Sequence, residues 1–205
     1  MLQSASMDST SHGGDEARGQ KAQSRRVELI GRIADVLLAD GVAQIPLRDL
    51  AARLGTSDRM LLYYFADKAD LVEASIEEVS SRLGVILAAS FSEERRPAAE
   101  VLDVTARLLS SPAAAPFMNV WADVSARGGR GEEPFQAIAK LTVKRSLAWL
   151  DVQLAIADDG ERRAAASAIL AVVEGVRMID AAAPGSTIGV TEFLSGSFAS
   201  DTPRS

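Results

Sequence analysis

Leu47-Arg-Asp-Leu-Ala-Ala-Arg-Leu-Gly-Thr-Ser57 and Leu61-Leu-Tyr-Tyr-Phe-Ala-Asp-Lys68 are the two stretches that decide the fold. In the first, apolar residues recur at spacings of three and four and predict the inward face of a helix over residues 46–54: Leu47, Leu50, Ala51 and Leu54. Gly55 follows as the expected C-terminal stop, and Ser57 is suited to be the N-cap of the next helix. The stretch therefore predicts a short helix, a tight turn and a second helix.

The second stretch predicts a very short helix over residues 58–66. Asp67 is suited to cap the helix that follows, with Asp70 three residues further on. Leu61 and Phe65 are four residues apart and face inward on such a helix. The remaining positions then face solvent, where tyrosines can bond phosphates or stack. These positions are Asp58, Arg59, Leu62 and at least one of Tyr63 and Tyr64.

An amphipathic helix is also predicted just upstream, over residues 24–39. Its expected apolar stripe consists of Val27, Ile30, Ala34 and Leu37. Gly41 ends it with a residue that tolerates left-handed backbone geometry, and Pro46 restarts the chain, since proline suits the first turn of a helix. Three such helices, the last two joined by a glycine-containing turn, are typical of a helix-turn-helix that projects a recognition helix into a major groove.

The composition favours an all-α protein. Hydrophobic residues make up 47% of the 205 residues but aromatic residues only 5%, and Ala and Leu dominate the apolar set, which favours helices over sheets. Residues 1–23 are rich in polar residues and lack the apolar centre of a secretory signal, so we expect a disordered tail there. The absence of cysteine and of a long uninterrupted apolar run indicates a cytoplasmic protein without a membrane segment.

The net charge of −6 argues at first against a nucleic-acid partner, because affinity for DNA rests on cations placed at phosphates. The distribution of charge along the chain argues for one. Residues 21–68 carry eight Lys or Arg against six Asp or Glu, a net of +2, whereas residues 69–205 carry thirteen against nineteen, a net of −6. A mildly basic segment before an acidic remainder fits a chain of which only the front touches DNA.

Residues 47–57 and 61–68 together resemble the signature of the TetR family of transcriptional regulators. The similarity covers roughly residues 25–75 and continues into Asp70-Leu-Val-Glu-Ala74, which looks like the start of the family's connecting helix. The resemblance implies a three-helix DNA-binding domain, residues 24–68, before a larger helical effector-binding and dimerisation domain, residues 69–205. It further implies a dimeric, sequence-specific regulator, usually a repressor released by a small molecule.

The resemblance also implies a set of DNA-binding residues on the helix-turn-helix and at the start of the connecting helix: Arg48, Ser57, Asp58, Arg59, Tyr63, Tyr64 and Lys68. Arg48 and Arg59 are placed to reach base edges or phosphates, and arginine bidentate to guanine is the most specific such contact. Tyr64 and Lys68 are implied to clamp the DNA backbone, and Tyr63 to pack on a sugar or base.

Two positions depart from the family's pattern. Leu62 stands where the family often has a phosphate-binding tyrosine, and Pro46 stands where a threonine usually caps the second helix and touches phosphate. Both differences remove a hydroxyl group that could bind phosphate but remain compatible with the helices. The usual phosphate contacts therefore do not transfer directly to this chain, and Tyr63 is the candidate to compensate.

Further helices are predicted after residue 68, bounded by Pro or Gly: one from about Lys68 to Ile86, then 98–110, 115–127, 134–157, 161–182 and 187–198. Large side chains gather in the central block, where converging helices could wall an apolar cavity. Our hypothesis is a pocket for a small apolar effector, lined by Phe117, Met118, Trp121, Phe135 and Trp149. Ordinary core packing is the alternative for each of them.

The last two predicted helices carry small and branched apolar side chains that look like a pairing surface. By resemblance, two such helices from each subunit form a four-helix interface in a homodimer. The predicted interface residues are Ile169, Val173, Val176 and Phe193. A two-fold dimer explains how short recognition helices read a palindromic operator in double-stranded DNA.

Three other functions have to be compared with this one. An enzyme is disfavoured because the only histidine is His12 in the tail, cysteine is absent, and neither a Gly-rich phosphate loop nor a metal-spaced carboxylate set occurs; no cofactor and no metal site are expected. A purely structural bundle does not account for the exposed Arg59 and paired tyrosines. A regulator controlled by a protein partner instead of a small molecule stays open, with Gly128 to Glu133 as a candidate contact loop.

Overall fold

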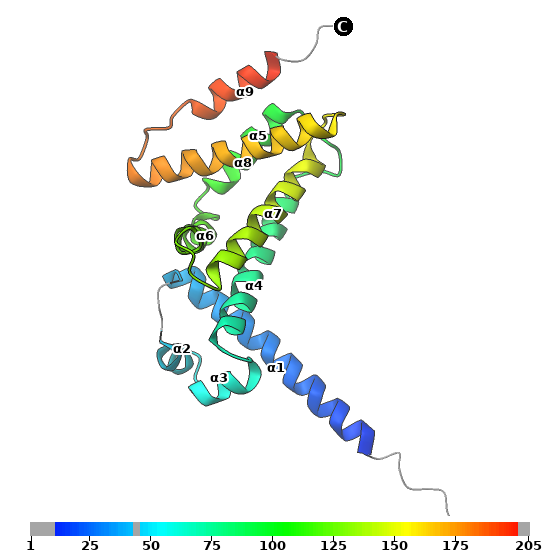
Figure 1. Cartoon of the computed structure of the whole chain (residues 1–205), viewed down its shortest axis with the longest axis vertical. Helices are drawn as coiled ribbons and strands as arrows, with labels where there is room; N and C mark the ends of the chain where they lie inside the picture. The colour runs from blue at the N-terminus through cyan, green and yellow to red at the C-terminus, as the bar shows by residue number, and fades with distance from the viewer. Residues whose placement is uncertain (1–10, 43–45, 201–205) are drawn as a thin grey trace, which may run out of the picture. The chain divides into compact units, whose positions relative to one another are not determined.

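The computed structural model describes residues 11–42 and 46–200, and side chains within 19–42 and 46–196. Over this part of the chain the fold is all-α, as predicted: the structure has nine helices and no strand (Figure 1). None of these helices is both long enough and apolar enough to cross a membrane. The chain divides into two compact units, residues 1–78 and 79–205, and the boundary falls within the helix α4 (Lys68–Ala88).

The N-terminal unit begins with a helix that is longer than predicted. Helix α1 (Ser11–Asp40) starts well before residue 24, so residues 11–23 are helical and the prediction of disorder there is wrong. Residues 1–10, the rest of the predicted tail, lie outside the described residues. The extension contains several strong helix formers and no proline, and lengthening an existing helix costs far less free energy than nucleating one.

The inner face of α1 differs slightly from the predicted stripe. Leu29, Ile33, Ala34 and Leu37 are buried, whereas Val27 is 59% exposed. The buried face is centred on the row formed by Leu29, Ile33 and Leu37, which leaves Val27 at its margin. The amphipathic helix was therefore predicted correctly, but the predicted stripe included the exposed Val27 and missed the buried Leu29 and Ile33.

The turn between α2 (Leu47–Arg53) and α3 (Asp58–Tyr64) has the geometry that the sequence predicts. Gly55 adopts a φ of 66°, in the left-handed region that favours glycine. The N–H of Gly55 donates to the carbonyl of Ala52 at 3.1 Å, and the N–H of Thr56 donates to that of Ala51 at 2.9 Å. These two bonds form a Schellman motif, which satisfies the last carbonyls of α2 and turns the chain into α3.

The second unit contains the end of α4 and five further helices, close to the predicted ranges: α5 (Ala98–Leu109), α6 (Ala115–Gly129), α7 (Phe135–Gln153), α8 (Asp159–Ala182) and α9 (Val190–Ser200). Helix α5 packs against α8 and α9, and α7 packs against both α6 and α8 (Figure 1). Two polar contacts fix the ends of α8. Near the start of α8, Arg162 binds Asp151 and Asp159. Near the end of α8, Asp180 accepts a hydrogen bond from Thr187, which follows the helix.

A cluster of buried side chains from α5, α7 and α8 forms a core of this unit: Val101, Leu102, Ala106, Leu150, Leu154, Ala166, Ile169 and Val173. Two of the predicted dimer-interface residues are members of this cluster. Ile169 and Val173 are 0% and 2% exposed within a single chain, so neither side chain has surface to offer a partner. The sequence pattern identified an apolar face of α8 correctly but assigned it to the wrong neighbour.

Candidate nucleic-acid interface

Side-chain caps stand at the start of α3 and at the start of α4, which follows it. The Ser57 hydroxyl accepts a hydrogen bond from the N–H of Met60 at 3.2 Å, and the Asp67 carboxylate accepts one from the N–H of Asp70 at 2.9 Å, at the start of α4. Both caps were predicted from the sequence. Since a helix of seven residues is not stable on its own, these caps and the packing of its inner face determine where α3 points.

The inner and outer faces of α3 are those that the sequence predicts. Leu61 and Phe65 are buried, and Tyr63 is 72% exposed. Tyr64 is half-buried, and its ring meets that of Tyr63 edge to face, with the centroids 5.0 Å apart. The outer face of the helix carries five exposed side chains: Asp58, Arg59, Met60, Leu62 and Tyr63.

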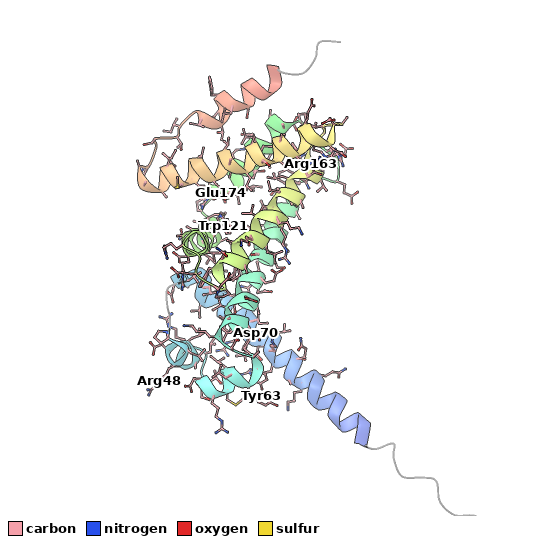
Figure 2. All side chains as sticks on the ribbon, viewed as in Figure 1. Arg48, Tyr63, Asp70, Trp121, Arg163 and Glu174 are labelled. Atoms are coloured by element: carbon pink, nitrogen blue, oxygen red, sulfur yellow. The ribbon has the colours of Figure 1, made fainter. Side chains whose placement is uncertain are left out.

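Of the seven residues predicted to bind DNA, all are exposed except the half-buried Tyr64. Arg48 and Tyr63 project outward from α2 and α3 (Figure 2). Asp58 accepts a hydrogen bond from the backbone N–H of Arg59 at 2.9 Å. No described residue pairs with the guanidinium of Arg59 or the ammonium of Lys68. The unit therefore presents accessible cations, a tyrosine and a hydroxyl on one short helix and its flanks.

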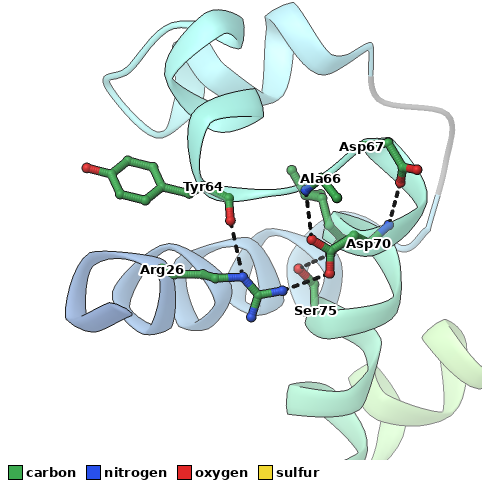
Figure 3. A network of polar contacts seen from close by, with 7 residues as sticks. Arg26, Tyr64, Ala66, Asp67, Asp70 and Ser75 are labelled. Atoms are coloured by element: carbon green, nitrogen blue, oxygen red, sulfur yellow. Dashed lines mark hydrogen bonds and ion pairs between the residues drawn. The ribbon is translucent and has the colours of Figure 1, made fainter. Parts of the chain in front are cut away.

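A network of polar contacts on the inner side of α3 holds this helix in place (Figure 3). The sequence did not predict this network. Arg26 of α1 donates through Nε to the carbonyl of Tyr64 at 3.2 Å and through Nη2 to Asp70 at 2.7 Å. The other oxygen of Asp70 accepts the N–H of Ala66 at 2.9 Å. The guanidinium also lies over the ring of Phe65, 5.0 Å from its centroid. One arginine thus joins α1, the end of α3 and the start of α4.

A second arginine of α1, Arg32, binds the C-terminal end of α2. Arg32 donates through Nη2 to the carbonyl of Leu54 at 2.7 Å. Both arginines thus meet carbonyls at helix C-termini, where the helix dipole is negative and favours cations. Arg26 and Arg32 lie off the apolar stripe that the sequence predicts for α1. Their position beside that stripe was the available signal, because long side chains at such margins bury their stems and reach polar groups.

We expect Arg26→Met to destabilise the N-terminal unit by about 1–3 kcal/mol, because it leaves the half-buried Asp70 carboxylate and the Tyr64 carbonyl without their donor. Urea unfolding measures the change, and amide exchange should become faster across α3. Arg25→Met is the matched control, since among the described side chains Arg25 pairs only with exposed Glu28 on the same helix and such pairs contribute about 0.5 kcal/mol or less. Equal effects of the two variants would contradict the assigned role of Arg26.

The five predicted pocket residues occupy different settings in the second unit. Trp149 packs against the core cluster and meets Phe91 edge to face at 4.8 Å. Met118 and Phe135 are buried, and the guanidinium of Arg127 lies 3.7 Å from the centroid of the Phe135 ring. Phe117 and Trp121 are half-buried and lie one helical turn apart on α6, where Figure 2 labels Trp121. Trp149 is half-buried as well, so Phe117, Trp121 and Trp149 are the predicted pocket residues that keep accessible surface.

The segment from Gly128 to Glu133 is the candidate contact loop of the sequence analysis. Ion pairs to Glu132 stabilise its conformation. Arg127 and Arg130 each bind Glu132 at 2.8 Å, and these hydrogen bonds hold the pKa of the Glu132 carboxyl below its ordinary value. Gly128, in the last turn of α6, lies at a close approach to α7, where an added Cβ would lie 3.0 Å from that of Ala139. The segment is a tight connection between two packed helices.

Comparison with known proteins agrees with this geometry. Residues 32–75 match the family model described as bacterial regulatory proteins, tetR family. No curated protein matches the sequence. The fold is similar to that of a transcriptional regulator from Rhodococcus sp. Rha1, with a TM-score of 0.64 and 20% identity over 84% of this chain and 91% of that one.

The fold is likewise similar to that of the multidrug binding protein EbrR, with a TM-score of 0.63 and 18% identity over 88% of this chain and 96% of that one. At these identities the two structures support the fold of the whole chain, and the family model identifies the DNA-binding unit. Residues 32–75 thus form a helix-turn-helix unit of the kind found in the tetR family of bacterial regulatory proteins.

Proposed function

We propose that this regulator binds a specific operator by placing α3 in the major groove of DNA. The observation that carries the proposal is the outer face of α3, where Arg59 and Tyr63 are exposed. Ser57 caps the start of this helix, and Arg26 binds the carbonyl of its last residue, Tyr64. A short, rigidly held helix with accessible donors is the arrangement that reads base edges in this class of protein.

Each predicted residue has a proposed role that matches its exposure. Arg59 reads a base edge, and arginine on guanine O6 and N7 is the commonest specific pairing. Arg48, Tyr64 and Lys68 contact the phosphate backbone and set the register, with Tyr63 packed on a sugar or base. Ser57 and Asp58 chiefly hold the start of the helix. Leu62, 50% exposed, is suited to the methyl group of a thymine.

We further propose that the chain acts as a homodimer through the outer face of α8 and through α9. Small side chains and one methionine follow each other along this face and are exposed or half-buried: Ala164, Ala168, Ala171, Gly175, Met178 and Ala182. Phe193 of α9 is 75% exposed, and Val176 is half-buried beside the face. Small residues allow two helices to approach closely, and exposed large apolar groups beside them indicate an interface.

Phe193→Asp is expected to convert the dimer to a monomer at micromolar concentration, because a buried anion at an interface without a partner costs several kcal/mol. Sedimentation equilibrium measures this as a fall in mass to that of one 21.7 kDa chain. Val85→Asp is the matched control, since Val85 of α4 is similarly exposed, at 69%, but lies outside the proposed interface. A dimeric Phe193→Asp variant would contradict the assignment.

The second unit is proposed to bind a small apolar effector that releases the operator. EbrR was crystallised as a multidrug binding protein with imidazole, which supports a small-molecule site in a protein of the same fold. Phe117 and Trp121 are the best candidates among the five predicted residues because both keep accessible surface, whereas Trp149, also half-buried, packs against the core cluster. Such an effector lowers DNA affinity only by binding one conformation of the dimer more tightly than the other.

The proposed function is tested by selection from a pool of random-sequence duplexes with the full-length protein. The expected result is enrichment of one motif with two-fold symmetry, bound in a salt-dependent manner. Failure to enrich any motif would overturn the proposal of specific DNA binding. A motif without symmetry would overturn the proposal that a dimer reads the operator.

A further inference from the structure

The N-terminal extension of α1 carries an unusual concentration of positive charge. Between Ala17 and Val27 the chain has four cations, Arg18, Lys21, Arg25 and Arg26, and no Asp or Glu, although its net charge is −6. The structure shows that this stretch is a continuous helix that leads into the DNA-binding unit. Neither the family model, which matches residues 32–75, nor the predicted DNA-binding set includes any of it.

The helical register divides these cations between two faces. Arg26 points toward α3 and α4, where it binds the carbonyl of Tyr64 and the carboxylate of Asp70. Positions 18, 21 and 25, at spacings of three and four, share the neighbouring face. Lys21 is exposed, and Arg25 is 40% exposed and bonded only to Glu28 of its own helix, at 2.6 Å. This cationic face has no partner from another helix among the side chains described.

The bond from Arg26 to Tyr64 brings the cationic face close to the proposed phosphate contacts. It ties α1 to the last residue of α3, beside Tyr63 and just before Lys68. Within the N-terminal unit, α1 then continues outward past α3 (Figure 1). A rise of about 1.5 Å per residue places Lys21 only about 8 Å along the helix from Arg26. Phosphates that flank those contacted by Tyr64 and Lys68 lie at comparable spacings along a DNA strand.

We propose that Lys21 and Arg25 bind the DNA backbone at a second place, which extends the footprint beyond the groove that α3 occupies. This inference rests on the proposed function, because α3 must first dock. Both side chains bind phosphates and not bases, so they add affinity and salt dependence without altering the preferred sequence. Glu28 competes with the DNA for Arg25 and limits the strength of this interaction.

The test compares wild type with Lys21→Gln/Arg25→Gln on the duplex that wild type selects from the random pool. Affinity is measured by fluorescence anisotropy at several salt concentrations. The log–log slope of affinity against salt is expected to become shallower by about 0.9 for each phosphate that a subunit no longer neutralises, with the base preference unchanged. Glu28→Gln, which frees Arg25, should make binding tighter at low salt.

Two matched controls separate a local interaction with phosphate from a general effect of charge. Lys140→Gln/Lys144→Gln removes the same charge from the exposed surface of α7, and Glu100→Gln removes one carboxylate from α5. The inference predicts slopes equal to wild type for both controls. Equal slopes for wild type and Lys21→Gln/Arg25→Gln would overturn it. Failure of the proposed function looks different, because wild type itself would then show no preferred sequence.

Discussion

Arg59→Ala is expected to weaken binding to the selected operator by about two orders of magnitude. Arg59 is exposed on the outer face of α3, and no described residue pairs with its guanidinium. A bidentate arginine–guanine pair contributes about 1–3 kcal/mol of discrimination, and a dimer makes two such pairs. Since each 1.4 kcal/mol is about a factor of ten in affinity, the combined loss leaves only binding that depends on phosphates.

The measurement is a titration of the operator duplex at fixed ionic strength, with sedimentation equilibrium of the same variant. Arg163→Ala is the matched control because Arg163 is exposed on α8, outside the DNA-binding unit (Figure 2). We expect that control to bind as wild type does, and both variants to remain dimeric. Wild-type affinity in Arg59→Ala would contradict the role assigned to α3.

Ile169→Ala is expected to lower the free energy of unfolding by about 2–5 kcal/mol, the usual cost of deleting most of a buried aliphatic side chain and leaving a cavity. Ile169 is 0% exposed and packs in the cluster of α5, α7 and α8. This loss of stability arises within the fold of a single chain and not at an interface between two chains. The destabilisation should therefore persist at every protein concentration and leave the dimer dissociation constant nearly unchanged.

Met178→Ala is the comparison for this experiment, because Met178 lies on the same helix but is 72% exposed. Its effect on the unfolding of the isolated chain should stay within about 0.5 kcal/mol, while the proposed dimer is weakened. Chemical unfolding at two protein concentrations distinguishes the two variants. A purely concentration-dependent loss in Ile169→Ala would return Ile169 to the interface and contradict its placement in the core of one chain.

The parts of the fold that depend on local signals could be predicted from the sequence. Gly55 ends α2 because a positive φ is needed there, Ser57 caps α3, and Asp67 caps α4. The spacing of Leu61 and Phe65 determines which side of α3 is buried, and so which side is outward. Each of these features is set by residues within one or two turns, where propensity and capping are informative.

The features that the sequence did not predict depend on residues that are distant in the chain. Arg26 looks like one cation among several until Tyr64 and Asp70 are placed beside it. Ile169 and Val173 form an apolar face of α8, but periodicity cannot say whether α5 or a second subunit covers that face. For the same reason, aromatic content alone did not show that Trp149 packs on Phe91 and on the core cluster.

Methylation interference on the selected operator tests whether α3 contacts bases in the major groove. Methylation of guanine N7 blocks the acceptor that a bidentate arginine uses. If Arg59 reads guanine, methylation blocks wild-type binding at guanines in two clusters on one face of the duplex, whole helical turns apart, and Arg59→Ala loses this sensitivity. Wild-type binding that is indifferent to N7 methylation throughout the operator would contradict the placement of α3 in the major groove.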